Sequence, residues 1–337
     1  MKIIYDVAIS LIANIFSAVI IALMGYLVFI VKNSVYSNIF RKYISPKERV
    51  LETGVYKICE IKRLDNTNFS SPVPPKIKEL FVDLYQERNC TELYNNSAIR
   101  IDELDKNGML TISKVDFYDF ITTNLTAYTS NSPAKSFGNM VYTVFKYFKL
   151  FSSAQEVKNS IRLKIGKNPD FKKVLSVNEL ANIAAVNILI EDKVGDVVLV
   201  KRSKRAAVSS GDFSVSVCGT PSVEDFDKED PFAECATRKI REEIGVDISK
   251  ERLEFKTVVI SKQKMQPIFL YTAKLDEEWK NYYEYMSKSE KFKLKNEKFY
   301  VVPRKSVMKF ARKKIMPDES AYQLWRYYSE SKDKKTV

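Results

Sequence analysis

The chain has 337 residues, 45% of them hydrophobic and 29% charged, a mixture typical of a folded protein with about two or three domains. A formal net charge of +13 favours anionic partners such as nucleotides, nucleic acid or an acidic membrane face, although an inert basic surface fits equally well. The sequence contains no histidine, which excludes a histidine general base and histidine-containing metal sites. Its four cysteines form no CxxC pair, which predicts a reducing compartment and no structural zinc.

Residues 7–31, VAISLIANIFSAVIIALMGYLVFIV, form an uncharged apolar segment near the start of the chain. Because about 20 apolar residues suffice for a helix to cross a bilayer, we predict a single transmembrane helix within residues 1–32. The apolar run is too long for a signal peptide, and no A-x-A cleavage site follows it. Lysines and arginines follow the segment closely, and the positive-inside rule therefore places the rest of the chain in the cytoplasm.

One face of this predicted helix carries small or polar residues at spacings of three and four. They are Ser10, Asn14, Ala18, Ala22 and Gly25. Small residues let transmembrane helices approach closely, and an asparagine can form a hydrogen bond across such a contact. This stripe predicts a homo-oligomer assembled through the helix, although small residues are also common in membrane helices that stay apart.

The middle region, residues 33–175, contains no motif that defines a role. The stretch SSPVPP at 70–75 predicts a turn or boundary. The stretch 141–151 mixes aromatic and basic residues and fits either a buried helix or an element at a membrane surface. Residues 102–114 resemble a calcium loop only in part, because Lys114 stands where a bidentate glutamate is required. We therefore predict a plain turn at Asn107 and Gly108.

Strand patterns begin after residue 176. Strands are predicted at 184–192, 196–203 and 212–219, and a basic loop separates the second from the third. Its basic side chains are Lys201, Arg202, Lys204 and Arg205. Lysine and arginine pair well with phosphate, so this loop is a candidate nucleotide-binding or phosphate-binding element.

A helix with clear end signals follows. Asp230 suits the N-cap and Pro231 the first helical position, and Gly245 suits a left-handed residue just past the end. An apolar residue recurs every four positions from Phe232 to Ile244, which predicts one buried face.

Glu242 and Glu243 lie on this predicted helix, with Lys239 between them in projection. Two carboxylates this close repel each other unless a cation lies between them, and in a phosphohydrolase that cation is Mg²⁺ or Mn²⁺. Arg238, four residues before Glu242, is placed to brace it. Taken alone, the pattern also fits a helix whose salt bridges face solvent.

Residues from about 180 to 305 resemble the Nudix hydrolase family. Members carry a glycine, an acid and then Arg-Glu-apolar-x-Glu-Glu-x-Gly-apolar on a loop–helix–loop. The matching residues are Gly219, Asp230, Arg238, Ile240, Glu242, Glu243, Gly245 and Val246. The resemblance implies an α/β fold, a Nudix-like α/β/α sandwich with a mixed sheet, which we place at 176–325, followed by a basic tail at 326–337.

The same resemblance implies a site. Glu242 and Glu243 would bind Mg²⁺ or Mn²⁺ with help from the backbone carbonyl near Gly219, and Glu297 is the candidate for a third acid. Arg238 would join both glutamates in catalysis if the site is active.

Two features depart from the family pattern. Ten residues separate Gly219 from Asp230, so the intervening loop is enlarged, and Lys239 replaces an acid that acts with the metal. A lysine there can pair with Glu242 or Glu243, supplying the charge that a metal would supply. We therefore expect weak metal binding and slow or absent hydrolysis.

The order of segments, one membrane helix and then a Nudix-like part, resembles the membrane-attached Nudix effectors of CBASS antiphage systems. That resemblance implies an inner-membrane effector activated by a cyclic nucleotide, the second messenger made by a linked nucleotidyltransferase. The helices would assemble among the membrane lipids and disrupt the membrane, killing the cell. The alternative is a membrane-tethered Nudix diphosphohydrolase acting on a nucleoside diphosphate derivative. Which nucleotide is bound, how many copies assemble and what residues 33–175 do are left open.

Overall fold

The computed structural model describes residues 44–89, 94–125, 148–203, 206, 208–209 and 211–333, together with Ser17, Ile20 and Met24. Apart from those three residues, the predicted membrane segment 7–31 lies outside the described residues. The stripe lies outside them too: Ser10, Asn14, Ala18, Ala22 and Gly25. Within the described ranges, no helix has the length and apolar character needed to cross a membrane.

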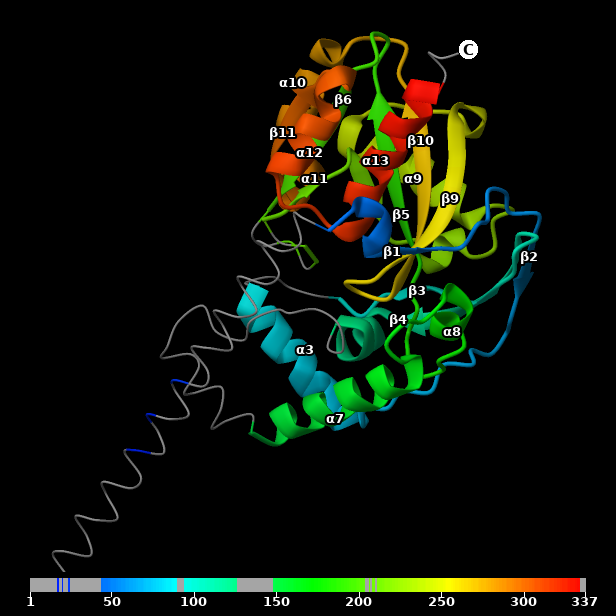
Figure 1. Cartoon of the computed structure of the whole chain (residues 1–337), viewed down its shortest axis with the longest axis vertical. Helices are drawn as coiled ribbons and strands as arrows, with labels where there is room; N and C mark the ends of the chain where they lie inside the picture. The colour runs from blue at the N-terminus through cyan, green and yellow to red at the C-terminus, as the bar shows by residue number, and fades with distance from the viewer. Residues whose placement is uncertain are drawn as a thin grey trace, which may run out of the picture. The chain divides into compact units, whose positions relative to one another are not determined.

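The main sheet of the described chain has eight strands (Figure 1). Its path is β1 (Val50–Glu52), β9 (Leu253–Ser261), β10 (Gln266–Lys274), β5 (Ala185–Glu191), β6 (Val197–Arg202) and β11 (Asn296–Val302), with β7 (Phe213–Ser214) beside β6 and β8 (Val217–Gly219) beside β5. Strands β5 and β10 are parallel and the other pairs are antiparallel. The predicted mixed sheet is confirmed.

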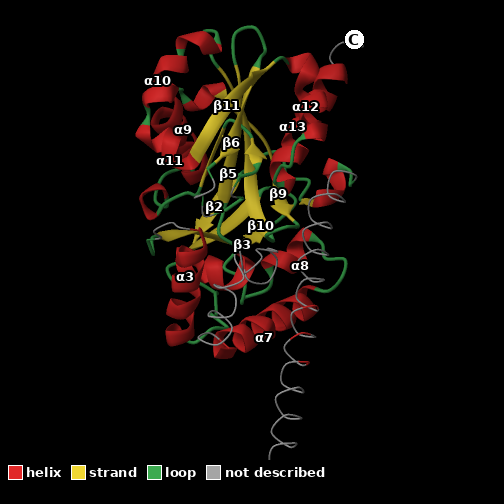
Figure 2. Cartoon of the chain, turned by 90° about the vertical axis from the view of Figure 1, so that its left-hand side faces the viewer, coloured by secondary structure: helices red, strands yellow, loops and turns green. Residues whose placement is uncertain are grey.

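Helices cover both faces of this sheet (Figure 2). On one side lie α9 (Pro231–Ile244), α10 (Tyr283–Lys288) and α11 (Glu290–Lys295), and on the other lie α12 (Val307–Lys313) and α13 (Asp318–Asp333). Both faces need cover because the side chains of β5 point alternately into two separate hydrophobic cores. Ile188 shares a core with Phe232 of α9, whereas Leu189 shares another with Leu324 of α13. This is the α/β/α sandwich expected from the sequence.

The third predicted strand, 212–219, is divided into β7 and β8 by Ser216. Its hydroxyl donates to the Val198 carbonyl at 2.6 Å and accepts from the Ile190 amide at 2.9 Å. Strands β5 and β6 pair only at Glu191 and Val197, beside their connecting turn. The serine therefore bridges them where they separate.

A second sheet, of three strands, lies in the middle region. Its order is β2 (Glu60–Arg63), β4 (Met109–Asp116) and β3 (Ser97–Leu104). The helices there are α3 (Pro75–Asn89), α4 (Phe117–Phe120), the π-helix η3 (Ile121–Leu125), α7 (Phe148–Ile165) and α8 (Phe171–Leu175). Short 3-10 turns are η2 (Pro46–Arg49), η4 (Val223–Asp225), η5 (Lys250–Arg252), η6 (Trp279–Asn281) and η7 (Arg304–Ser306).

The turn predicted at Asn107 and Gly108 joins β3 to β4. Asp105 accepts hydrogen bonds from the amides of Asn107 at 2.8 Å and Met109 at 2.9 Å. Gly108 has φ +84°, and a Cβ there would lie 2.1 Å from the Lys57 carbonyl oxygen, so only glycine fits. The proline-rich stretch 70–75 ends where α3 begins, at Pro75. Of the stretch 141–151, residues 141–147 lie outside the described part and α7 begins at Phe148.

Contacts or helices continue across two of the expected segment boundaries. The described residues from Ser45 onward lie in one compact unit, and β1 of the middle region pairs with β9. Helix α13 also runs through residue 326, where a tail was expected to begin. Strand pairing therefore connects the middle region with the sandwich across the expected 175/176 boundary.

Candidate functional site

Helix α9 begins and ends where its sequence signals predict. Asp230 accepts hydrogen bonds from the amides of Phe232 at 3.0 Å and Ala233 at 2.9 Å. Gly245 has φ +80°, and a Cβ there would lie 2.5 Å from the Tyr285 ring. The last turn of the helix carries Glu242, which is half-buried, and Glu243, which is buried.

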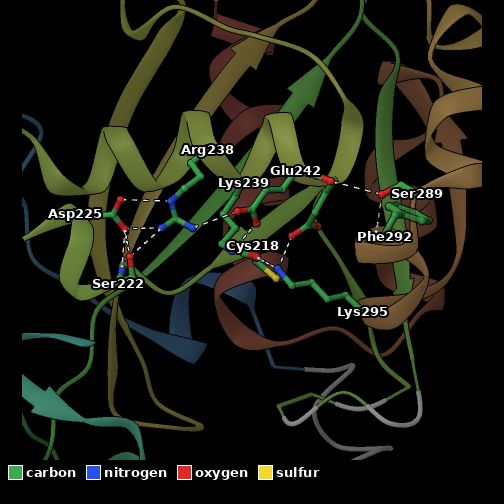
Figure 3. A network of polar contacts seen from close by, with 10 residues as sticks. Cys218, Ser222, Asp225, Arg238, Lys239, Glu242, Ser289, Phe292 and Lys295 are labelled. Carbon is green, nitrogen blue, oxygen red and sulfur yellow. Dashed lines mark hydrogen bonds and ion pairs between the residues drawn. The ribbon is translucent and has the colours of Figure 1, made fainter. Parts of the chain in front are cut away.

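Glu242 is held by two cations of its own helix (Figure 3). The Lys239 Nζ lies 2.7 Å from Glu242 Oε2, and the Arg238 Nη1 lies 3.5 Å from Oε1. The stem of Lys239 crosses Gly219, where an added Cβ would lie 2.8 Å from the lysine Cγ. A side chain at 219 would therefore require the Lys239 stem to shift. The predicted internal ion pair of Lys239 is confirmed.

Glu243 is held by Lys295, a residue that the sequence analysis missed. The Lys295 Nζ lies 2.5 Å from Glu243 Oε1 and donates to the Cys218 carbonyl at 3.4 Å. The Glu243 side chain is only 3% exposed. Burial alone would lower the pKa of Lys295, but the Glu243 carboxylate and Cys218 outweigh it and raise the pKa above its ordinary value. Lys295 is therefore charged at neutral pH.

Helix α11 is fixed to α9 at both ends. At its N-terminus Ser289 accepts from the Phe292 amide at 3.2 Å and donates to the Glu242 carbonyl at 3.4 Å (Figure 3). At its C-terminus Lys295 reaches Glu243. The two anchors place the Lys295 ammonium at the glutamate pair.

The enlarged loop between Gly219 and Asp230 supplies a partner for Arg238. Asp225, which is buried, lies 2.5 Å from Arg238 Nη2 and also accepts from the Ser222 amide at 2.8 Å. Ser222 and Asp225 form a capping box around η4. A serine followed three residues later by an acid is the sequence signal that could have identified this turn.

The small sheet of the middle region holds the same loop. The Arg63 Nε donates to the Phe226 carbonyl at 2.8 Å, and its Nη2 contacts the Lys228 carbonyl. The Lys114 Nζ lies 4.5 Å from the centre of the Phe226 ring. A role therefore emerges for part of residues 33–175, which is to brace the loop that positions Arg238.

The glutamates predicted to bind metal are each paired with a lysine in the structure. Glu297, on β11, pairs with Lys201 at 3.1 Å, and the two adjacent glutamates of α9 each have a lysine partner. Over the described ranges, no group of three or more histidine, cysteine, aspartate or glutamate side chains is placed to hold an ion. Mg²⁺ and Mn²⁺ require several oxygen ligands. Ammonium groups already contact the carboxylates of Glu242 and Glu243, so these residues do not fit a divalent cation.

Of the four residues predicted to bind phosphate, only Lys201 and Arg202 are described by the structure. Lys204 and Arg205 lie outside the described residues, and Lys201 pairs with Glu297. Arg202 adjoins the glutamate network, because its Nη1 contacts the Cys218 sulfur at 2.9 Å and its Nε donates to the Val208 carbonyl at 3.0 Å. These two acceptors are a cysteine sulfur and a backbone carbonyl, and neither is a carboxylate.

No family model and no curated protein matches the chain. Several solved structures are similar to part of it. DR0079 from Deinococcus radiodurans is 16% identical, covering 43% of this chain and 83% of that one, with a TM-score of 0.32. The NUDIX domain of Shewanella oneidensis NrtR, in complex with ADP ribose, is 14% identical, covering 45% and 88%, with a TM-score of 0.30. A bifunctional NMN adenylyltransferase/ADP ribose pyrophosphatase from Francisella tularensis, in complex with AMP and a Mn ion, is 13% identical, covering 66% and 64%, with a TM-score of 0.30. These are distant structural similarities to Nudix domains and carry over no activity or ligand.

Proposed function

We propose that the cytoplasmic part of this chain binds a nucleotide through its phosphates without hydrolysing it. The observation that carries the proposal is that Lys239 and Lys295 neutralise the two glutamates that a Nudix hydrolase would use. A carboxylate held by an ammonium group is a poor metal ligand and a poor base. Binding of phosphate by basic side chains such as Arg202 requires neither a metal ion nor a general base.

The network around the glutamates favours anions. It joins four basic side chains to three acidic ones, a balance of 4 − 3 = +1: Arg202, Arg238, Lys239 and Lys295 against Asp225, Glu242 and Glu243. A guanidinium group binds phosphate through paired charge-assisted hydrogen bonds. Arg202 contacts the Val208 carbonyl and the Cys218 sulfur, and neither of these is a carboxylate. A phosphate at Arg202 would face a region of positive charge.

We further propose that nucleotide binding activates a membrane effector of the CBASS type. The ligand would be a cyclic nucleotide made by a linked nucleotidyltransferase. Support comes from the uncharged segment 7–31 and its stripe of small residues, which give the bound state a helix to assemble. Assembled helices would disrupt the inner membrane.

A membrane-tethered Nudix diphosphohydrolase is the second candidate. It is favoured by the adjacent glutamates and by Arg238, which lies 3.5 Å from Glu242 as a bracing residue would. The two candidates differ in whether a nucleoside diphosphate derivative is turned over.

Turnover is the test of the proposal. We expect the full chain in detergent, supplied with Mg²⁺ or Mn²⁺, to bind members of a panel of linear and cyclic nucleotides and to release no product above the no-enzyme rate, because both glutamates are paired. Chromatography of the nucleotides and a direct binding assay measure the two quantities. Rapid turnover that is lost in a folded Glu242→Gln variant would establish the hydrolase instead.

Arg202→Ala is expected to weaken nucleotide binding about tenfold or more, because a charge-assisted hydrogen bond to phosphate contributes roughly 1.5–3 kcal/mol. The control is Arg252→Ala. It removes an arginine of η5 that is paired with Asp276. Calorimetric titration gives the affinities, and thermal unfolding checks that the loop contact of Arg202 to Val208 is not essential for folding. If Arg202→Ala and Arg252→Ala bind the nucleotide with equal affinity, the nucleotide does not bind at Arg202.

A further inference from the structure

The Lys295 ammonium group contacts the kinds of oxygen that a divalent cation would select. One is a carboxylate oxygen of buried Glu243, and the other is the carbonyl oxygen of Cys218, the residue before Gly219. Mg²⁺ binds carboxylate and carbonyl oxygens, with a strong preference for such hard ligands. Lys295 thus lies between the two types of ligand that the sequence assigned to a metal.

Lys239 completes the arrangement from the other side. Its Nζ contacts Glu242 Oε2, while Arg238 approaches the second oxygen of the same carboxylate. The two ammonium groups together carry the charge of one divalent ion. They arrive from different elements, Lys239 from α9 and Lys295 from the end of α11, so the pairing of both glutamates is a property of the fold and not of one helix.

An incidental surface ion pair would look different. Exposed pairs hold two solvated groups and contribute little, whereas the Glu243 side chain is 3% exposed, and a carboxylate buried without a partner of opposite charge is costly. A metal ion entering this site would meet two positive groups within the reach of its ligands and would have to displace them.

We infer that Lys295, acting with Lys239, is a built-in cation that replaces the divalent ion, so that the folded site neither needs nor binds Mg²⁺ or Mn²⁺. The inference concerns the same residues as the proposed function but does not rest on nucleotide binding. A protein that binds no nucleotide could still have this internal cation, and a nucleotide receptor could lack it.

The experiment uses the full chain in detergent, stripped with chelator and then supplied with millimolar Mn²⁺ or Mg²⁺. The expected wild-type result is a melting temperature within about 1 °C of the metal-free value, since an ion that binds the native state would raise it, and no protein-bound Mn²⁺ by electron paramagnetic resonance. The double variant Lys239→Glu/Lys295→Met frees Glu243 and adds a carboxylate. We expect it to bind Mn²⁺ and to melt several degrees higher with the ion, on the order of 5 °C.

Lys288→Met is the matched control, because it removes an exposed lysine paired with Glu284 on neighbouring α10 and should leave metal binding unchanged. Stoichiometric Mn²⁺ binding by the wild type, with a raised melting temperature, would overturn the inference. So would a folded double variant that binds no Mn²⁺, since the lysines would then not be what excludes the ion. If the double variant folds only when Mn²⁺ is present, the inference is supported; if it does not fold at all, the wild-type measurement decides.

Discussion

Lys295→Met is expected to lower the free energy of unfolding by about 3 kcal/mol, because it leaves the Glu243 carboxylate buried without a counter-charge. Methionine preserves the unbranched stem, so the change removes charge with little loss of packing. The estimate lies at the lower end for a broken buried pair, because the Lys295 side chain is 33% exposed while that of Glu243 is 3% exposed. Denaturant unfolding of the full chain in metal-free detergent solution measures the difference.

Two variants separate the loss of charge pairing from general damage. Lys295→Met/Glu243→Gln removes both charges and should recover most of the lost stability, since a neutral amide is less costly to bury than a carboxylate. Lys288→Met breaks an exposed ion pair on α10 and should stay within about 0.5 kcal/mol of the wild type. If Lys295→Met is as stable as Lys288→Met, the pairing of Glu243 is not what holds α11 against α9.

The sequence predicted α9 well because its signals are local. The N-cap at Asp230, the left-handed Gly245 and the apolar residues every four positions all concern neighbours within one or two turns. The same locality made the pairing of Lys239 with Glu242 predictable, since residues three apart on a helix lie side by side.

Contacts between distant parts of the chain were not predictable in this way. Lys295 follows Glu243 by 52 positions, and no spacing rule connects a lysine at the end of one short helix with a glutamate on another. Glu297, two residues later, is the third acid predicted from the family resemblance, and it pairs with Lys201 on the neighbouring strand. The three residues of β1 fall within the middle region 33–175, and their partners lie far along the chain in β9.

The braced loop changes what the departures from the Nudix pattern mean. The enlarged loop provides Asp225 for Arg238, and Arg63 of the middle region fixes the loop through its carbonyl groups. The extra residues and the middle region therefore form one structure that positions the arginine. Arg63, the loop and Arg238 thus form a continuous series of contacts between that sheet and Glu242.

The double substitution Ala18→Leu/Ala22→Leu is expected to abolish membrane permeabilisation by an effector that works through helix assembly. The stripe of the predicted helix must face neighbouring helices, and larger side chains would hold the backbones apart and remove close packing. Leucine keeps the segment apolar, so insertion into the membrane should survive. Nucleotide binding should survive too, because the glutamate network lies on α9 and α11.

The measurement is dye uptake by cells that express each variant beside the nucleotidyltransferase. Ala8→Leu/Ala13→Leu is the matched control, because it adds the same two side chains outside the arc of the stripe. At about 100° of rotation per residue, Ala8 lies about 40° and Ala13 about 60° beyond its edges. An effector should lose dye uptake in the stripe variant and keep it in the control, with equal amounts of both proteins in the membrane. A tethered hydrolase would show no difference, since its helix serves only as an anchor. If the stripe variant permeabilises cells as the wild type does, the prediction that the helices assemble through Ala18 and Ala22 is wrong. Nucleotide binding would then have to cause permeabilisation without that contact.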